Sequence, residues 1–276
     1  MPVKELIVVE KIRVLVAGAC GRMGREVVKA VLADPGLQLA GAVDKINQNK
    51  DIGLSIGLEQ LNVLIRSDLG AALELEQPQV VVDFTTPACV MQNLREIAAH
   101  KVHAVVGTTG LSPENLQELS DLCSEHNVNI LVAPNFAIGA LLMMRFAAQA
   151  ARYFSQVEII ELHHDQKLDA PSGTAIKTAE MIIAGRNGAC RNNLSEEKIK
   201  GVRGGEMGGI HLHSIRLPGL IAHQEVIFGG EGQTLTIRHD SLSRESFMPG
   251  VVIGIKKVLD TPGLTYGLDQ ILFKAL

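Results

Sequence analysis

Two adjacent imidazoles and a nearby ammonium are the side chains in this sequence best suited to bind and protonate an anion. His163 and His164 follow an alternating run at 157–162, and Lys167 comes shortly after them. The next segment, 171–175, reads Pro-Ser-Gly-Thr-Ala and has the composition of a helix start, where N–H groups and the positive end of the helix dipole attract negative charge. This stretch is therefore predicted to be a strand-to-helix junction that binds an anion.

The residue types alone do not show which of these side chains protonates the ligand and which ones bind it. Adjacent residues on a strand point to opposite faces, so only one of His163 and His164 readily faces a ligand unless the strand ends between them. Ser172 is equally compatible with a helix N-cap and with a ligand contact. Taken in isolation, His163 and Lys167 would also fit a solvated polar loop.

A glycine-rich turn near the other end of the chain is a second candidate anion site. It lies between the apolar, β-branched run 12–17 and the segment 25–33, whose apolar residues have helical spacing. Strand, glycine turn and helix are the context of a dinucleotide-binding fingerprint, although the spacing here is G-x-x-G-x-x-G instead of G-x-G-x-x-G. An ordinary turn is the alternative. The candidate phosphate-binding residues are Gly18, Gly21, Arg22, Met23 and Gly24.

Asp44 favours the dinucleotide interpretation. It ends the next predicted strand, 37–43, and lies 20 positions after Gly24, where an acidic residue accepts hydrogen bonds from the adenosine ribose. A carboxylate suits NADH, whereas the neighbouring Lys45 suits the additional 2′-phosphate of NADPH. The pair therefore predicts NADPH or NADH as the coenzyme, with a solvated charge pair as the alternative.

The elements that must position these residues form a doubly wound α/β sheet. Short, continuously apolar runs at 62–65, 80–84, 104–106 and 130–132 alternate with helical stretches, and such runs are typical of parallel strands covered on both faces. We therefore predict a Rossmann-type parallel sheet between residues 12 and 134.

Three of these runs end in polar loops that should share one edge of the sheet, because ligands of open α/β sheets bind beyond the carboxyl ends of the strands. Small hydroxyl and glycine residues there would let a nicotinamide lie against the backbone. Each loop on its own also fits simple turn chemistry. The candidate nicotinamide-side residues are Phe84, Thr85, Gly107, Thr108, Thr109, Pro134, Asn135 and Phe136.

The rest of the chain predicts a second, α+β domain. A packing helix at 138–154 precedes the strand at 157–162, and a helix at 174–184 follows the junction. A glycine-rich mobile loop is predicted at 189–209. Period-two strands at 210–217, 222–228 and 234–239 should form a mixed, largely antiparallel sheet, and an apolar helix at 249–259 should return to the first domain. The predicted domains are 1–134 plus 244–276 for the dinucleotide, and 135–243 for the substrate.

Composition excludes several classes of partner. The 276-residue chain is 46% hydrophobic, and it has a net charge of −4 without a basic block, which argues against nucleic acid. No long apolar segment or signal peptide is visible, so we expect a cytoplasmic protein without a membrane partner. The four cysteines are scattered, as free thiols of a reducing compartment are: Cys20, Cys89, Cys123 and Cys190.

His211 and His213 would share a strand face and could ligate one metal ion, but no third ligand is evident in the sequence. We therefore predict no metal site.

The chain resembles the dihydrodipicolinate reductase family, whose members are also called 4-hydroxy-tetrahydrodipicolinate reductases. The resemblance rests on Glu-Leu-His-His at 161–164, Lys167 and Asp-Ala-Pro-Ser-Gly-Thr-Ala at 169–175. It extends to the G-x-x-G-R-M-G turn, the three nicotinamide-side loops, Arg-Leu-Pro-Gly at 216–219 and the segment around Ser243-Arg244. Some members have Glu-Arg where this chain has Asp-Lys at 44–45, which leaves the coenzyme preference open.

The resemblance implies an enzyme of diaminopimelate and lysine biosynthesis that reduces a cyclic dicarboxylate with NADPH or NADH, and a homotetramer assembled through the second domain. It implies His163 and Lys167 as the catalytic residues, with His163 as the acid. Lys167 would be the main cation for a substrate carboxylate and would help to orient the protonation. His164 would contact a carboxylate, and Gly173 and Thr174 would bind the other one.

The sequence also leaves two alternative functions open. The first is another two-domain NAD(P)H reductase of an amino-acid intermediate, such as an amino-acid or semialdehyde dehydrogenase. A semialdehyde dehydrogenase would need a cysteine nucleophile, and neither Cys89 nor Cys123 is well placed for that role. A cofactor-sensing protein without activity would not need the His163 and Lys167 pair.

Overall fold

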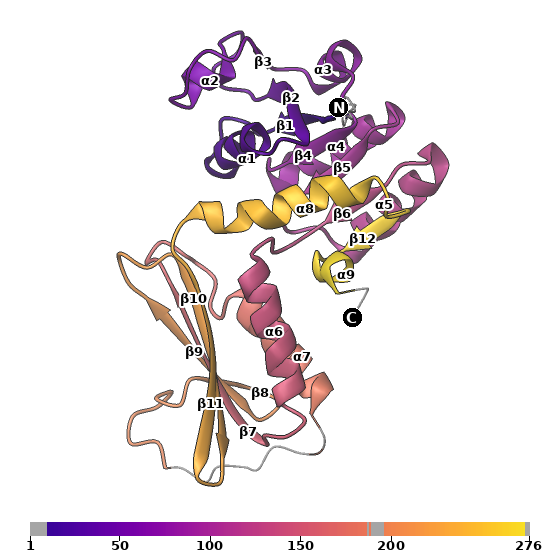
Figure 1. Cartoon of the computed structure of the whole chain (residues 1–276). Helices are drawn as coiled ribbons and strands as arrows, with labels where there is room; N and C mark the ends of the chain where they lie inside the picture. The colour runs from indigo at the N-terminus through magenta and orange to yellow at the C-terminus, as the bar shows by residue number, and fades with distance from the viewer. Residues whose placement is uncertain (1–9, 187, 189–195, 274–276) are drawn as a thin grey trace, which may run out of the picture. The chain divides into compact units, whose positions relative to one another are not determined.

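The computed structural model describes residues 10–186, 188 and 196–273, and it divides the chain into two compact units (Figure 1). The first unit comprises Met1–Phe136 and Phe247–Leu276, and the second comprises Ala137–Ser246. The second unit is therefore an insertion into the first.

The first unit is built on a seven-stranded, all-parallel sheet with the strand order β12-β6-β5-β4-β1-β2-β3. This confirms the predicted doubly wound sheet. Its strands are β1 (Ile12–Ala17), β2 (Leu37–Val43), β3 (Ile65–Arg66), β4 (Val80–Asp83), β5 (His103–Val106), β6 (Ile130–Val132) and β12 (Leu264–Tyr266).

Two strands differ from the sequence prediction. The run at 62–65 contributes only Ile65 to β3, because Leu64 forms an isolated antiparallel bridge with Asp51 instead. The predictions did not include β12, which has three residues and no apolar alternation long enough to reveal it. It extends the sheet by pairing in parallel with β6.

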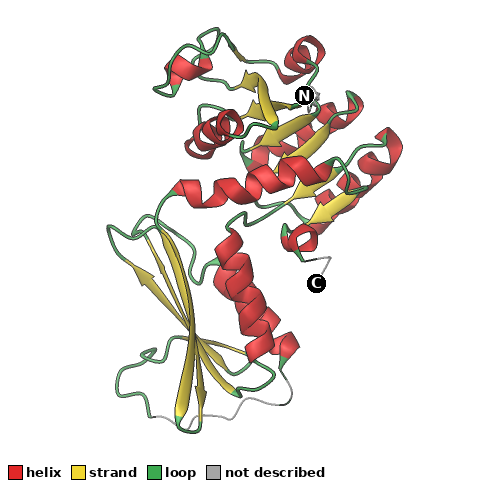
Figure 2. Cartoon of the chain, viewed as in Figure 1, coloured by secondary structure: helices red, strands yellow, loops and turns green. Residues whose placement is uncertain are grey.

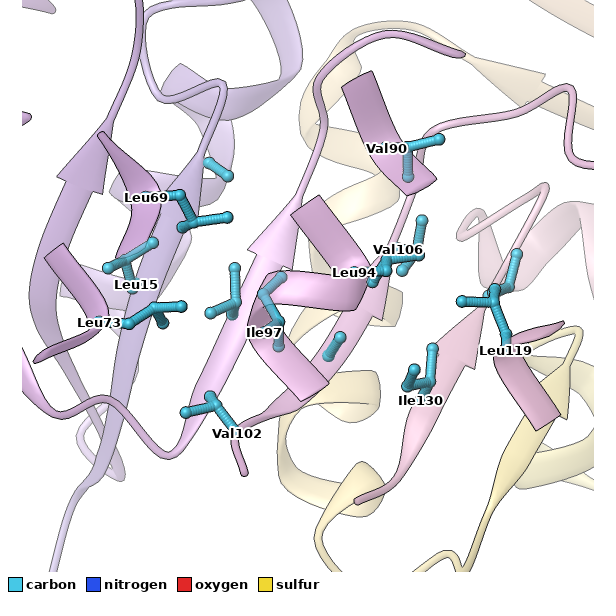
Figure 3. Packing of buried hydrophobic residues seen from close by; sticks show 14 of the residues in the cluster. Leu15, Leu69, Leu73, Val90, Leu94, Ile97, Val102, Val106, Leu119 and Ile130 are labelled. Atoms are coloured by element: carbon cyan, nitrogen blue, oxygen red, sulfur yellow. The ribbon is translucent and has the colours of Figure 1, made fainter. Parts of the chain in front are cut away.

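Helices cover both faces of this sheet. On one face α1 and α8 pack against each other, while α3, α4 and α5 form a continuous layer on the other. Figure 3 shows Leu73 of α3 and Ile97 of α4 among the buried aliphatic side chains of this layer. Each fully buried aliphatic side chain contributes roughly 1.5–3 kcal/mol. The helices are α1 (Arg22–Ala33), α2 (Ile52–Ser55), α3 (Leu69–Glu76), α4 (Pro87–Ala99), α5 (Pro113–His126), α8 (Met248–Val258) and α9 (Asp269–Leu272).

The second unit contains a five-stranded mixed sheet with the order β11-β10-β7-β9-β8. Three of its four strand pairs are antiparallel, as predicted, and β7 pairs with β9 in parallel. Figure 2 shows the helices of this unit on one side of the sheet. Its elements are α6 (Ile138–Ala150), β7 (Gln156–His163), α7 (Gly173–Gly185), β8 (Gly205–Met207), β9 (Ile210–Arg216), β10 (Ala222–Gly230), β11 (Gln233–Ser241) and the 3-10 helix η1 (Arg244–Phe247).

The prediction of a loop over 189–209 was wrong for β8. Gly208 and Gly209 both have positive φ, at 57° and 81°, and this is the backbone conformation of a tight hairpin turn. The glycines that suggested a loop therefore connect β8 to β9 in an antiparallel pair. Residues 189–195 of the predicted loop lie outside the described residues.

The two faces of the second sheet differ in composition. Ile159, Glu161, Leu212 and Val226 are buried, and they lie on the face against which α6 and α7 pack. Glu158 and its alternate neighbours along β7 lie on the opposite face. The covered face therefore places a carboxylate, Glu161, among aliphatic residues.

Candidate active site

The glycine turn between β1 and α1 has no room for a side chain at Gly18 or Gly24. Gly18 has a φ of +77°, and a Cβ there would lie 2.6 Å from the Phe84 carbonyl oxygen. A Cβ on Gly24 would lie 2.0 Å from the Gly18 carbonyl oxygen, which also accepts a 3.0 Å hydrogen bond from Gly21 N–H. No side chain caps the start of α1. The turn therefore presents backbone and a helix N-terminus, as a pyrophosphate site requires.

Asp44 lies next to this turn. One of its carboxylate oxygens accepts a 2.8 Å hydrogen bond from Cys20 N–H, and the other accepts one of 3.1 Å from Ile46 N–H. Each oxygen retains a lone pair for a ribose hydroxyl. Lys45 is exposed beside it. The two predicted adenosine-side residues are thus adjacent to the predicted phosphate turn.

Sequence reasoning did not identify Asp83, the buried last residue of β4, which connects two of the predicted nicotinamide-side loops. Its Oδ1 accepts hydrogen bonds from Thr85 N–H at 3.0 Å, from the Thr85 hydroxyl at 2.8 Å and from the Thr108 hydroxyl at 2.9 Å. Its Oδ2 accepts one of 2.8 Å from the Asn93 amide. The available signal was a charged residue at the end of a run of three buried valines.

The third loop, after β6, packs onto the first. The rings of Phe84 and Phe136 lie 5.8 Å apart between centroids, and a Cβ on Gly107 would lie 2.0 Å from the Phe84 ring. The structure therefore brings all the predicted cofactor residues to the carboxyl edge of one parallel sheet. Thr108 and Phe136 are buried, whereas Thr109 and Pro134 are exposed.

In the second unit, β7 ends at His163, and His164 begins a turn closed by a 3.2 Å hydrogen bond from Lys167 N–H to the His164 carbonyl. The strand thus ends between the two histidines, so strand alternation does not force them onto opposite faces. Ser172 is the N-cap of α7, since its hydroxyl accepts a 3.2 Å hydrogen bond from Ala175 N–H. Gly173 and Thr174 are the first residues of that helix.

Beneath the junction, Glu161 accepts hydrogen bonds from several groups. His163 Nδ1 lies 2.5 Å from its Oε2, and Arg216 donates to both of its oxygens at 2.9 and 2.7 Å. Ser172 N–H donates to Oε1 at 3.2 Å. Burial raises the pKa of Glu161, but the hydrogen bonds from His163 and Arg216 outweigh it and lower this pKa to about 2.

Lys167 lies at the exposed side of the junction, where its ammonium contacts both carboxylate oxygens of Asp169 at 2.7 and 2.8 Å. That hydrogen bond lowers the pKa of Asp169. Arg216 also donates a 2.7 Å hydrogen bond to the Asp169 carbonyl oxygen. The loop that carries Lys167 is therefore attached to the same arginine as the glutamate beneath His163.

The cysteines do not support a thiol nucleophile. Burial raises the pKa of the Cys123 thiol to about 11, and burial followed by the Asp44 charge raises that of Cys20. Nucleophilic cysteines need a lowered pKa, because the thiolate is the reactive form. Cys89 is half-buried in α4, and Cys190 lies outside the described residues.

Within the described residues, no group of three or more His, Cys, Asp or Glu side chains is arranged to hold a metal ion. His213 instead lies 2.8 Å from a carboxylate oxygen of Glu158. Over the same residues, no helix has the length and apolar character to cross a membrane.

Comparison with known proteins decides the family. Residues 12–136 match the family profile described as dihydrodipicolinate reductase, N-terminus, and residues 139–272 match the one described as its C-terminus. This chain belongs to the dihydrodipicolinate reductase family. The predictions of a reductase fold, an NAD(P)-binding first domain and an NAD(P)H-dependent oxidoreductase of diaminopimelate and lysine biosynthesis are confirmed at the level of this family.

Individual relatives agree. A 4-hydroxy-tetrahydrodipicolinate reductase from Syntrophomonas wolfei is 54% identical over 95% of this chain and 99% of its own length, and one from Moorella thermoacetica is 51% identical over 95% and 98%. The structure is similar to that of a dipicolinate-bound dihydrodipicolinate reductase from Paenisporosarcina, with a TM-score of 0.83 and 45% identity over 95% of this chain and 99% of that one. An amine dehydrogenase from Mycobacterium smegmatis, 18% identical with a TM-score of 0.62 over 92% and 94% of the two chains, shares the fold.

Proposed function

We propose that this chain reduces 4-hydroxy-tetrahydrodipicolinate to tetrahydrodipicolinate with NADPH or NADH. One hydride and one proton enter the substrate and one water leaves, so the reaction balances. The observation that carries the proposal is the junction at 161–175, where an imidazole, an ammonium and a helix start lie together above a buried glutamate. The dipicolinate bound by the Paenisporosarcina protein is a cyclic dicarboxylate of the same kind.

His163 is the acid in this proposal, because it carries an imidazole at the end of β7 and lies close to Lys167 in the chain. Lys167 binds a substrate carboxylate, which replaces the carboxylate of Asp169. The start of α7, with Gly173 N–H and the Thr174 hydroxyl, binds the second carboxylate, and His164 contacts one of the two.

The dinucleotide supplies the hydride when it is bound. The turn with glycine at 18, 21 and 24 fits its pyrophosphate, Asp44 and Lys45 fit the adenosine end, and the loops joined by Asp83 fit the nicotinamide end. In the proposed division of roles, the first unit binds the dinucleotide, and the second binds the substrate and forms the oligomer.

Assembly into a homotetramer is part of the proposal. The described helices α6 and α7 cover one face of the second sheet. The other face carries half-buried aliphatic residues that a second copy would cover: Ile160, Leu162, Ile215 and Ile227. Light scattering of the purified chain should give four times the 29.6 kDa monomer mass, and a monomer would contradict this assignment.

An NAD(P)H oxidation assay with enzymatically generated 4-hydroxy-tetrahydrodipicolinate tests the activity. Oxidation should depend on the substrate and should be inhibited competitively by dipicolinate. If the folded wild-type chain binds NADPH or NADH but does not turn over this substrate, the proposed reaction is wrong.

A further inference from the structure

Glu161 is a buried carboxylate within the proposed substrate site, and none of the roles above uses it. It precedes His163 by two positions on β7, so both side chains lie on the same face of the sheet. The distance from its Oε2 to His163 Nδ1 is 2.5 Å. Burying a carboxylate costs several kcal/mol of desolvation, which its hydrogen bonds must offset, and one of these hydrogen bonds joins it to the proposed acid.

The protonation state of Glu161 determines which nitrogen of His163 carries a hydrogen. Because the pKa of Glu161 is lowered to about 2, the group is a carboxylate at neutral pH and only accepts hydrogen bonds. Nδ1 must then be the donor, in both the neutral and the cationic imidazole. Nε2 is left as the atom that gains and loses a proton.

Arg216 fixes the carboxylate in this orientation. In the parallel register of β7 and β9, Arg216 lies opposite His163, and its guanidinium contacts both oxygens of Glu161. A two-point pair of this kind sets the plane of the carboxylate as well as its distance. Ser172 N–H, at the start of α7, donates to Oε1 as well. Groups from β7, β9 and α7 therefore hold one carboxylate against one imidazole.

We propose that Glu161 is the positioning residue of the reaction, which holds His163 in the Nδ1–H form so that the proton is delivered from Nε2, and that Arg216 keeps Glu161 in place. This inference rests on the proposed function of His163 as the acid. In the transfer, the Nε2–H bond breaks, its proton goes to the substrate, and the imidazole is left neutral with Nδ1–H still bound to Glu161.

Glu161→Gln is the informative substitution because it changes the side chain from acceptor-only to acceptor plus donor. Oε1 accepts from Ser172 N–H and from Arg216 Nη2, which remain donors at any pH near neutrality. Arg216 Nη1, which faces Oε2, also donates to the Ile215 carbonyl oxygen. The amide oxygen should therefore take the Oε1 position. The amide N–H₂ then faces His163 Nδ1 and favours the opposite tautomer.

Glu158 provides a matched control on the same strand. It also pairs with one arginine, Arg203, and one histidine, His213, but it lies on the opposite face of the sheet. Glu158→Gln removes the same charge from the same kind of cluster without touching the junction. For each variant, only the fraction that elutes with the wild-type protein in size-exclusion chromatography is assayed.

The first test is a double-mutant cycle in kcat. Glu161→Gln should lower kcat about 100-fold, in the range of a lost general acid, and change the KM for NAD(P)H by less than about threefold. In a His163→Ala background the same substitution should lower kcat less than about threefold, because groups that act as a unit are not additive. Additive losses, or an equal loss in Glu158→Gln, would show that Glu161 acts only through the fold.

The second test reads the tautomer directly in the wild-type protein. Nitrogen-15 NMR of histidine-labelled enzyme at alkaline pH should show His163, assigned by its absence in His163→Ala, with hydrogen on Nδ1. Folded Glu161→Gln should show hydrogen on Nε2. A wild-type His163 with hydrogen on Nε2 overturns the inference even if Glu161→Gln fails to fold.

These outcomes distinguish the role of His163 from that of Glu161. If His163→Ala keeps wild-type turnover, the proposed acid is wrong. If His163→Ala loses turnover while Glu161→Gln keeps it, His163 stands as the acid and only the role of Glu161 fails.

Discussion

At the scale of single residues, the charged side chains of the site form two ion pairs that differ in how far solvent reaches them. Glu161 and Arg216 hold each other through two hydrogen bonds and are mostly shielded from solvent. Lys167 and Asp169 form a pair in which Asp169 is well exposed. Exposed ion pairs contribute about 0–1 kcal/mol, so a substrate carboxylate can displace Asp169 at little cost.

Lys167→Ala tests this exchange. It should lower kcat and raise the substrate KM, by about tenfold or more each, because a substrate carboxylate loses its ammonium partner. Steady-state kinetics against both substrates measures the effect, with the KM for NAD(P)H as the internal control. Unchanged substrate KM would remove Lys167 from the carboxylate site.

Lys45→Ala tests coenzyme choice. Loss of an exposed cation beside Asp44 should weaken NADPH binding by about tenfold, which corresponds to about 1.4 kcal/mol, and leave NADH binding nearly unchanged. Fluorescence titration with each coenzyme gives the two Kd values. Equal losses would mean that Lys45 does not meet the 2′-phosphate.

The lowered pKa of Glu161 also predicts acid sensitivity. Its pKa of about 2 in the folded chain lies below the ordinary value of 4.5, so its contribution to stability is present above pH 4.5 and is lost as the pH falls toward 2. The groups that face it are His163, Arg216, Ser172 and Ser214.

Urea unfolding at several pH values checks this dependence. The wild-type advantage over Glu161→Gln should shrink by roughly 3 kcal/mol across that window. A difference that does not vary with pH would contradict the lowered pKa.

At the scale of elements, the carboxyl ends of the parallel strands position the cofactor residues. These strands were predictable, because continuous apolar runs are read directly from sequence. The hydrogen bonds among the loops were not, since Asp83 and Thr108 are 25 positions apart and meet only through the pairing of β4 with β5. The pair of Glu161 and Arg216, 55 positions apart, likewise depends on the register of β7 and β9.

The ends of helices and strands also differ in how well the sequence predicts them. The Pro-Ser-Gly-Thr composition predicted where α7 begins, and Ser172 is its N-cap. The sequence predicted this strand over 157–162 and did not show whether it ends between His163 and His164, whereas in the structure β7 ends at His163. The end of a strand depends on its neighbours: β10 begins at Ala222 and β9 ends at Arg216, and both of these residues pair with His163.

Two substitutions at Asp83 test the connection between the loops. Asp83→Ala leaves the Thr85 N–H and the two threonine hydroxyls without their acceptor, at about 1–3 kcal/mol each. It should weaken coenzyme binding at least about tenfold. Asp83→Asn can keep these donors on its amide oxygen, while the Asn93 amide rotates to accept from its N–H₂.

Coenzyme titration and urea unfolding of both variants provide the measurement. Asp83→Asn should stay within about 1 kcal/mol of the wild type in both. If Asn is as damaging as Ala, the negative charge is required instead of the geometry of its acceptors.

At the scale of the whole molecule, the last residues of the chain belong to the unit that holds the glycine turn. β12 pairs with β6, and Gly267 N–H donates a 2.8 Å hydrogen bond to the carbonyl of Val132, just before the loop that contains Pro134 and Asn135. The C-terminal segment therefore supports one of the proposed nicotinamide-side loops.

Deleting the residues from Pro262 onward tests this support. The truncated chain should unfold at a lower temperature and bind NADPH less tightly, because β6 becomes an edge strand with unpaired backbone groups. Thermal unfolding and coenzyme titration measure the two effects. Coenzyme affinity equal to that of the full chain would limit β12 to a structural extension of the sheet.

The insertion of one unit into the other also sets an order of events during synthesis. Domains generally fold as units while the chain emerges from the ribosome, N-terminal parts first. Here α8 and β12 of the first unit are synthesised only after all the strands from β7 to β11 have been made. The first unit is therefore begun before the second, and until α8 has been made the nascent chain exposes the apolar surface that α8 will cover.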